Sequence, residues 1–399
     1  MTQQKSTRHN SPTQELIERA PAHATGMVVV DLDRVASNWR ALSDLVRPTE
    51  CAAVVKADAY GLGADHVIPA LAAAGCETFF VATLDEAIQA RKLAPSATTY
   101  MLDGLAKGAS EAVRKAGVIP VLSSLPEIEE WSALSATRKD RLASALHVDT
   151  GLNRLGLSAS EIQALVTGQH LLDRLNVTLV MSHLACADDP AHPKNALQRD
   201  IFNQLAPMLP STARSLAASD GLMLGKSFHY DLVRPGYALY GGQAFGGGRT
   251  PVEPVVEVYA KILQVRDVAP GQTVGYSATW TPTQASRIAV IAAGYADGLF
   301  RHLSRASENT ASTHSPQPAN PANVAINGEL APIVGRVSMD LVTINVTGLE
   351  KAPEPGDMVE LIGPNISIEA HGGASGTIGY EVLTNLRHRF HRLYVGGDC

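Results

Sequence analysis

The chain has 399 residues, of which 45% are hydrophobic and 18% are charged. This length suggests two or three domains, and the composition excludes both a peptide-sized module and a chain disordered over most of its length. Lysine and arginine number 33 against 39 for aspartate and glutamate, so the formal net charge is −6. Because no long basic block is present, we expect no nucleic acid as a partner.

The cysteines and the N-terminal segment indicate the cellular compartment. The cysteines lack C-x-x-C spacing, so neither a zinc site nor a disulfide framework is expected. The first 26 residues lack the apolar core of a signal peptide, and no apolar run approaches the length that spans a bilayer. We therefore expect a cytoplasmic protein that does not contact membranes. The four cysteines are Cys51, Cys76, Cys186 and Cys399.

The first predicted elements are a strand at residues 27–33, MVVVDLD, and a helix from about Asp33. From Cys51 to about Gly242 a short apolar run recurs, usually followed by an alanine-rich amphipathic stretch. This alternation predicts a (β/α)8 TIM-type barrel, although the last interval is short for a full helix. The eight runs end at Lys56, Thr83, Asp103, Ser123, Thr150, His183, Ser219 and Gly236.

After Gly242 the pattern changes to strand-like runs separated by Gly, Pro and Asn, which predicts a mostly β C-terminal domain. We expect the N-terminal strand to join its sheet. The expected division is therefore residues 33–245 for the barrel, and residues 1–32 plus 246–399 for the β domain. A polar stretch from Arg301 to Asn323 is predicted to be a mobile surface loop.

Lys56 is the most informative candidate for chemistry, because catalytic groups of a barrel follow its strands. A lysine that ends a buried run is costly to desolvate unless its amine is neutralised, paired or covalently engaged, as in a Schiff base. The alternative is a lysine whose side chain extends to solvent at the rim. The following turn carries a tyrosine and two glycines, in AVVKADAYGLGA, which suits a close-approaching ligand.

Over nearly its whole length the chain resembles the alanine racemase family. The motifs that carry the resemblance occur in the family's order: AVVKADAYGLGA, HVDTGLNRLG, SHLACADDP, YDLVRPGYALYG, VGYSATW, AAGYADG, GRVSMD and GTIGYE. The resemblance implies a barrel followed by a β domain, and a pyridoxal 5'-phosphate cofactor. It also implies interconversion of L- and D-alanine, which supplies D-alanine for peptidoglycan synthesis.

The resemblance assigns cofactor contacts to several of these residues. Lys56 matches the lysine that holds the cofactor covalently, Tyr60 matches a ligand of its phosphate, and Arg154 matches the arginine near its phenolic oxygen and the substrate carboxylate. Ser219 and the Gly236–Tyr237 backbone follow the last two predicted strands, where barrels commonly bind phosphate. Taken alone, Ser219 and Gly236 are also typical turn residues.

Arg234 matches an arginine that faces the pyridine nitrogen, where other enzymes place an acid. Because arginine keeps its proton, the ring nitrogen stays unprotonated and withdraws electrons less strongly. This favours racemisation over transamination. By the same resemblance, His183 supports Arg234 through a hydrogen bond. A lone histidine at a strand end is otherwise most often structural.

Racemisation needs proton transfer on both faces of the substrate, so two bases are expected. Lys56 is predicted to serve one face and Tyr276 the other. In the family, the β-domain tyrosine reaches the barrel of another subunit in a head-to-tail homodimer, whereas a core tyrosine is the default without the resemblance. The resemblance further implies that Tyr295 and Tyr380 narrow the substrate channel, with Tyr380 near the phosphate, and that the Met339 backbone contacts the substrate carboxylate.

Two positions depart from the family pattern. His147 stands where many members carry a carbamylated lysine that positions the arginine matched by Arg154. A histidine forms no lasting carbamate, so we expect chloride, ordered water or a carboxylate such as Asp149 beside Arg154; a backbone carbonyl is the simpler alternative. Ala218 stands where asparagine is usual, which removes one hydrogen-bonding group near the phosphate.

Other functions remain open at this point. A decarboxylase on the same architecture is disfavoured by Arg234, and a non-catalytic pyridoxal-phosphate carrier is disfavoured by Tyr276. A metallohydrolase is disfavoured because its candidate ligands lack metal-binding spacing, so no metal is expected. Those candidate ligands are His183, Asp188, Asp189 and His192. The sequence leaves open how strictly alanine is preferred over serine.

Overall fold

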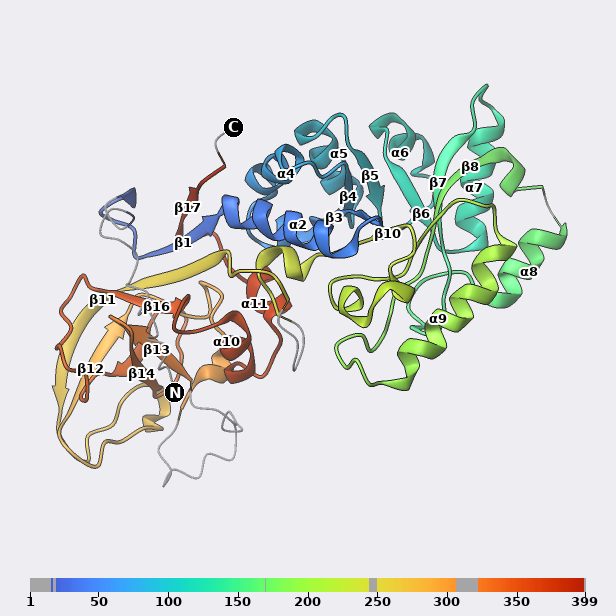
Figure 1. The fold of residues 1–399 in the computed structure, drawn as a ribbon. Helices are drawn as coiled ribbons and strands as arrows, with labels where there is room; N and C mark the ends of the chain where they lie inside the picture. Colours follow the sequence, from blue (N-terminus) through green and yellow to red (C-terminus); the bar gives the residue numbers. More distant parts are fainter. Residues whose placement is uncertain (1–15, 17–18, 169, 244–249, 306–321, 398–399) are drawn as a thin grey trace, which may run out of the picture. The chain divides into compact units, whose positions relative to one another are not determined.

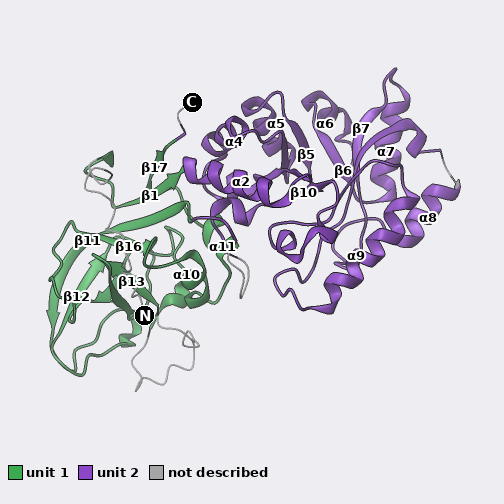
Figure 2. Cartoon of the chain, in the orientation of Figure 1, with its two compact units in different colours: residues 1–31, 254–396 green, residues 32–253, 397–399 purple. Residues whose placement is uncertain are grey.

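The computed structural model describes residues 16, 19–168, 170–243, 250–305 and 322–397 (Figure 1). The chain divides into two compact units (Figure 2): residues 32–253 and 397–399 form the barrel unit, and residues 1–31 and 254–396 form the β unit. Most of the predicted loop between Arg301 and Asn323 lies outside the described residues. Within the described ranges, no helix combines the length and apolarity needed to cross a membrane.

A parallel sheet forms the centre of the barrel unit (Figure 1). In the described part of the chain it runs in the order β3-β4-β5-β6-β7-β8-β9. Its strands are short and mostly buried, as is usual for parallel sheets. Their bounds are β3 (Ala53–Val54), β4 (Thr78–Val81), β5 (Thr98–Met101), β6 (Ile119–Leu122), β7 (Leu142–His147), β8 (Leu175–Met181) and β9 (Ala213–Ser215).

An eighth strand, β10 (Leu232–Val233), closes this sheet. It pairs in parallel with β2 (Glu50–Cys51), the segment directly before β3. On that side the Ala52 N–H donates to Val233 O (3.0 Å), and on the other side the Arg234 N–H donates to Ala217 O beyond β9 (2.9 Å). The eight predicted runs therefore match β3 to β10, and the predicted barrel is confirmed.

Helices follow most of the barrel strands. In α2 (Leu32–Val46), Trp39, Leu42 and Val46 are buried at helical spacing, so one face packs inward. Between Ser219 and Gly236 the chain forms two short 3-10 turns instead of a full helix, as the short interval predicts. The remaining helices of regular geometry are α4 (Ala64–Ala73), α5 (Leu84–Leu93), α6 (Ser110–Ala116), α7 (Leu125–Ala136), α8 (Ala159–Gly168) and α9 (Pro193–Leu205).

The β unit contains, among its described residues, a sheet in the order β12-β15-β14-β13-β16-β11-β1-β17, and β12 also pairs with β11. β1 (Gly26–Asp31) lies between β11 (Val256–Val268), which is antiparallel, and β17 (His391–Val395), which is parallel. The prediction that the N-terminal strand joins this sheet is confirmed. The other elements are β12 (Ser286–Ile291), β13 (Asn323–Ile326), β14 (Glu329–Val334), β15 (Val342–Asn345), β16 (Met358–Ile362), α10 (Ile368–Ala374) and α11 (Gly379–Thr384).

Candidate active site

Four predicted site residues follow the C-terminal ends of barrel strands. Lys56 and His183 each stand two residues after β3 and β8, Arg234 directly follows β10, and Ser219 follows β9. The carboxyl ends of parallel barrel strands share one rim. Burial, together with the positive charges of Arg234, Arg154 and Lys56, lowers the pKa of His183 to about 3. These cationic groups therefore gather around His183.

Lys56 begins a left-handed turn. It is the first residue of α3 (Lys56–Tyr60), and the four residues that follow it have φ angles between 53° and 56°. Left-handed helical backbone costs an L-residue roughly 1–2 kcal/mol, because Cβ crowds the following carbonyl oxygen. Four such residues in a row are therefore strained, and strain of this kind concentrates at functional sites.

A polar cradle lies where the chain leaves β9 and β10. Ser219 Oγ accepts hydrogen bonds from the Gly236 N–H (3.0 Å) and the Ala238 N–H (3.1 Å). A Cβ at position 236 would collide with the Tyr60 hydroxyl, so that position requires glycine. Burial raises the pKa of Tyr60, which keeps its hydroxyl neutral and able to donate. Backbone N–H groups and hydroxyls gathered in this way suit an anion such as phosphate.

Arg234 is fully buried beneath the same rim. Its Nη2 donates to Ser182 O (2.6 Å), and its Nη1 donates to Ser215 Oγ. Burial lowers the pKa of Arg234 to about 9, so it stays charged near neutral pH. No carboxylate in the described ranges pairs with it. The predicted hydrogen bond between His183 and Arg234 is also absent there, and the described partners of the guanidinium are Ser182, Ser215 and Leu216.

Ser182 and Ser215 were not predicted as partners of Arg234. Ser182 directly follows β8 and Ser215 ends β9, although the predicted run at that place begins with Ser215 and ends at Ser219. However, a serine at a strand end carries no motif that singles it out. Only the three-dimensional arrangement of β8, β9 and β10 shows that these oxygens meet the guanidinium.

His147 is the last residue of β7, and Arg154 lies in the segment that follows this strand. Burial, together with the charges of Arg234 and Arg154, lowers the pKa of His147 to about 4, so the imidazole is neutral at neutral pH. Its Nδ1 lies 3.5 Å from Ser123 Oγ. His147 therefore carries no charge that replaces a carbamate.

Asp149 stabilises the turn before Arg154. Its Oδ1 accepts hydrogen bonds from the N–H groups of Gly151 (2.9 Å), Leu152 (3.0 Å) and Asn153 (3.1 Å). No ion pair joins Asp149 to the exposed Arg154 within the described residues. Of the three alternatives expected beside Arg154, the Asp149 carboxylate is therefore wrong, and its Oδ1 holds the turn instead. Chloride and ordered water stay as predictions.

Three predicted residues of the β unit lie on loops that contact one another. Tyr276, which is 71% exposed, precedes the left-handed Ser277, whose Oγ accepts from Arg336 Nη1 (2.9 Å). The Tyr295 N–H donates to Ser338 O (3.1 Å) beside Met339. The β unit thus gathers Tyr276, Tyr295 and Met339 on adjoining loops. Tyr380 lies on α11 of the same unit.

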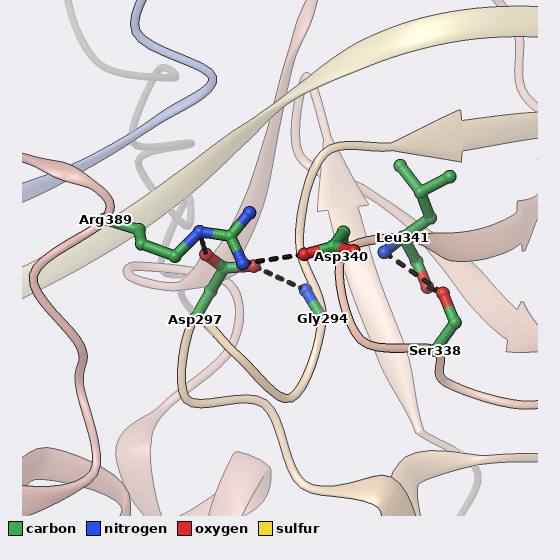
Figure 3. A network of polar contacts seen from close by, with 6 residues as sticks. All are labelled: Gly294, Asp297, Ser338, Asp340, Leu341 and Arg389. Atoms are coloured by element: carbon green, nitrogen blue, oxygen red, sulfur yellow. Dashed lines mark hydrogen bonds and ion pairs between the residues drawn. The ribbon is translucent and has the colours of Figure 1, made fainter.

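Arg389 joins two of these loops through carboxylates (Figure 3). Its Nε lies 3.2 Å from Asp297 Oδ1, and its Nη1 lies 2.7 Å from Asp340 Oδ1. Asp297 Oδ2 accepts from the Gly294 N–H (2.8 Å). Burial raises the pKa of Asp297, while the Gly294 N–H and Arg389 oppose the rise. Sequence reasoning missed Arg389, since no motif pairs it with carboxylates 92 and 49 residues away.

Two of the candidate metal ligands between residues 183 and 192 have local structural roles. His192 Nδ1 accepts from the Lys194 N–H (3.1 Å) at the start of α9, and Asp189 Oδ1 accepts from the Ala191 N–H (3.0 Å). Among the described residues, no group of three or more His, Cys, Asp or Glu side chains is arranged to hold a metal ion.

Comparison with known proteins decides the family. Residues 30–244 match the N-terminal domain of alanine racemase, and residues 255–394 match its C-terminal domain. The chain belongs to the alanine racemase family. The alanine racemase of Rhodospirillum rubrum is 43% identical over 376 residues, which cover 94% of this chain and 96% of that protein. The alanine racemase of Acidiphilium cryptum is 46% identical over 367 residues, which cover 92% of this chain and 98% of that protein.

Solved alanine racemases have the same fold. The structure from Bartonella henselae, which has covalently bound pyridoxal phosphate, matches with a TM-score of 0.87 and 39% identity, covering 93% of this chain and all of that one. The biosynthetic alanine racemase of Pseudomonas aeruginosa matches with a TM-score of 0.83 and 31% identity. The match covers 94% of this chain and 100% of that chain. The predicted family, fold and enzyme class, a pyridoxal-phosphate-dependent alanine racemase, are confirmed. The roles of single residues stay predictions.

Proposed function

We propose that the protein interconverts L- and D-alanine in the cytoplasm and supplies D-alanine for peptidoglycan synthesis. In this proposal residues 33–245 bind the cofactor, and residues 1–32 plus 246–399 contribute the second base. The observation that carries the proposal is Lys56, which lies at a barrel strand end on the rim where Ser219 and the Gly236 N–H form a polar cradle.

The chain's own groups fit pyridoxal phosphate. Tyr60, Ser219 and the Gly236–Tyr237 backbone would hold the phosphate, because a neutral hydroxyl and backbone N–H groups converge there without a Cβ at position 236. Lys56 would hold the cofactor covalently, with Tyr380 as a further phosphate contact. Arg154, His183 and Arg234 would line its ring. When bound, pyridoxal phosphate makes the α-hydrogen of an amino acid acidic.

Arg234 supports racemisation over other reactions of this cofactor. It is buried without a carboxylate partner among the described residues, and it keeps its protons near neutral pH. Arg234 would therefore face the ring nitrogen of the bound cofactor as a donor that keeps its own proton, and such a partner favours return of a proton to the α-carbon. An acidic residue at this position would favour decarboxylation or transamination. The same argument counts against the rival decarboxylase.

Two residues move the proton. Lys56 Nζ exchanges a proton with the α-carbon on one face, and Tyr276 Oη does so on the opposite face. Arg154 and the Met339 backbone orient the substrate carboxylate, and Tyr295 and Tyr380 narrow the channel so that small amino acids fit. A racemisation assay with L-alanine, L-serine and larger L-amino acids tests this assignment. Alanine should be converted fastest, and equal conversion of large substrates would contradict the narrow channel.

Replacing Arg389 with methionine should raise the KM for alanine by roughly tenfold and change kcat less. The variant loses the bridge from Asp297 to Asp340, so the loop that presents the Met339 backbone moves, and small displacements of positioning groups weaken binding. Steady-state kinetics measure the effect. Arg387→Met is the matched control, since its side chain bonds only Asn385 among the described residues (3.0 Å). Equal KM values for both variants would refute the role of the bridge.

We infer that the active unit is a homodimer with shared sites. Tyr276 and Met339 are 71% and 52% exposed on adjoining loops of the β unit, and Leu341 beside them is also exposed. Exposed apolar surface around candidate catalytic residues is typical of an interface. A second copy of the chain fits this surface, because its barrel unit would supply the Lys56 that Tyr276 needs. Two-fold symmetry would then complete both sites at once.

Co-expressing Lys56→Ala and Tyr276→Phe subunits should restore about one quarter of the wild-type activity per subunit. Random pairing makes half of the dimers mixed, and each mixed dimer has one site with both bases. Each variant alone should be nearly inactive. Activity of the mixture equal to the sum of the two separate variants would show that each site draws both bases from one chain.

A further inference from the structure

The turn after Lys56 needs an external support. Ala57, Asp58, Ala59 and Tyr60 are all left-handed, and none of them is glycine. The far end of the turn is held by its own bonds, since the Gly61 N–H donates to Ala57 O (2.7 Å). The near end, beside Lys56, has no such local bond from Ala57 N–H.

Glu86 supplies the support at the near end. Its Oε1 accepts a hydrogen bond from the Ala57 N–H (2.8 Å), the first amide after Lys56. Its Oε2 accepts from the Ala82 N–H (2.8 Å) and from the Thr83 N–H (3.3 Å). One carboxylate therefore joins the C-terminal ends of β3 and β4, two neighbouring strands of the barrel rim.

The position of Glu86 on α5 explains why it reaches both segments. Thr83 caps the helix, and its side chain accepts from the Glu86 N–H (3.3 Å) while Glu86 accepts from the Thr83 N–H. Such a capping box needs only the contact to Thr83. The bond to Ala57, 29 residues earlier, goes beyond helix capping and fixes the peptide that carries Lys56.

We propose that Glu86 is a positioning residue that directs the Lys56 amine into the active site. Holding the Ala57 N–H fixes the peptide plane between Lys56 and Ala57, and with it the direction in which the Lys56 side chain leaves the strand. The proposal rests on the proposed role of Lys56. It adds a residue that touches neither substrate nor cofactor but sets the geometry of the covalent attachment.

Glu86→Gln tests the proposal, and Thr83→Ala is the matched control. Glutamine keeps the shape but presents only one acceptor oxygen to two groups of N–H donors, so the bond to Ala57 or the bonds to the β4 end are lost. Thr83→Ala disturbs the helix cap and leaves the Glu86 carboxylate on Ala57. The probe is pyridoxal phosphate added to cofactor-free protein, and the readout is the rate at which its absorption shifts on attachment to lysine.

Attachment should be at least tenfold slower in Glu86→Gln and within twofold of wild type in Thr83→Ala. Binding of pyridoxine 5'-phosphate, which lacks the aldehyde, should be within twofold of wild type in both variants. Unchanged attachment in Glu86→Gln would overturn the proposal. An equal loss of pyridoxine 5'-phosphate affinity would also overturn it, because Glu86 would then support the whole turn rather than aim Lys56.

Two further measurements test the Ala57–Glu86 hydrogen bond and the role of Lys56 independently of the Glu86→Gln variant. Hydrogen exchange in the wild-type protein should show a protected Ala57 amide, and exchange at the unprotected rate would contradict the bond to Glu86 even if the variants fail to fold. Lys56→Ala is tested in parallel. If it attaches the cofactor as fast as wild type, the proposed function fails; if only Glu86→Gln behaves like wild type, the positioning role alone fails.

Discussion

Lys56→Ala is expected to lower the rate of alanine racemisation by about 10⁴-fold or more. The variant loses both the covalent anchor of the cofactor and one of the two proton-transferring groups, and a positioned acid or base alone contributes roughly 10²–10⁴-fold. Added pyridoxal phosphate should still bind at the Ser219–Gly236 cradle, because that contact does not involve Lys56. Activity assays at saturating cofactor measure the loss.

Borohydride reduction provides the chemical control. In the wild-type protein it should fix the cofactor on the peptide that contains Lys56, and in Lys56→Ala no lysine should be labelled. Lys92→Ala is the matched variant, since Lys92 is exposed in the last turn of α5, and it should behave like wild type. Label on another lysine of the wild-type protein would refute the assignment of Lys56.

Tyr276→Phe is expected to slow proton transfer on one face of the substrate by roughly 10²–10⁴-fold and to spare the other face. The substitution removes only the hydroxyl of a side chain that is 71% exposed on the β unit, so the fold should be retained. The measurement is the rate at which deuterium from solvent enters the α-position, starting separately from L-alanine and from D-alanine. The two enantiomers should differ strongly, since Lys56 can exchange only one of them.

Tyr230→Phe is the matched control for this substitution. Tyr230 donates one hydrogen bond to Asn203 (2.8 Å) and packs against Phe202 in the barrel unit. Its loss should leave both exchange rates near the wild-type values. Similar exchange from both enantiomers in Tyr276→Phe would exclude Tyr276 as a base.

The barrel was predictable because each strand and its rim residue lie next to each other in sequence. A buried run followed by a polar residue marks the strand end, and this pattern located Lys56, His183 and Ser219 before any contact was known. The interval from Ser219 to Gly236 was also predictable, since a chain of that length has no room for a full helix.

The supports of the site were not predictable, because they join segments that are distant in sequence. Arg389 meets carboxylates on two other loops, and Ser215 meets Arg234 across neighbouring strands. Glu86 carried a local signal, the T-x-x-E spacing from Thr83, but that pattern explains only its helix-capping bond. A sequence pattern shows the role of a residue within its own helix or strand. The contact of Glu86 with Ala57 depends instead on how β3 and β4 lie side by side in the barrel.

The expectation for Asp149 also shows that closeness in sequence does not reveal which groups a side chain contacts. An acidic residue five positions before Arg154 is a reasonable ion-pair partner by distance along the chain. Its Oδ1 instead accepts three backbone N–H groups of the turn, and no ion pair with Arg154 forms among the described residues. A carboxylate that lies near an arginine in sequence can therefore bind its own turn instead.

The most direct test of the account is the reaction of L-alanine in D2O with purified protein and pyridoxal phosphate. Magnetic resonance and chiral chromatography follow the products together. The account predicts D-alanine that carries deuterium at the α-carbon, an equal final mixture of the enantiomers, and neither carbon dioxide nor pyruvate in stoichiometric amounts. Retention of the original α-hydrogen in the D-alanine that forms, or release of carbon dioxide with formation of ethylamine, would contradict it.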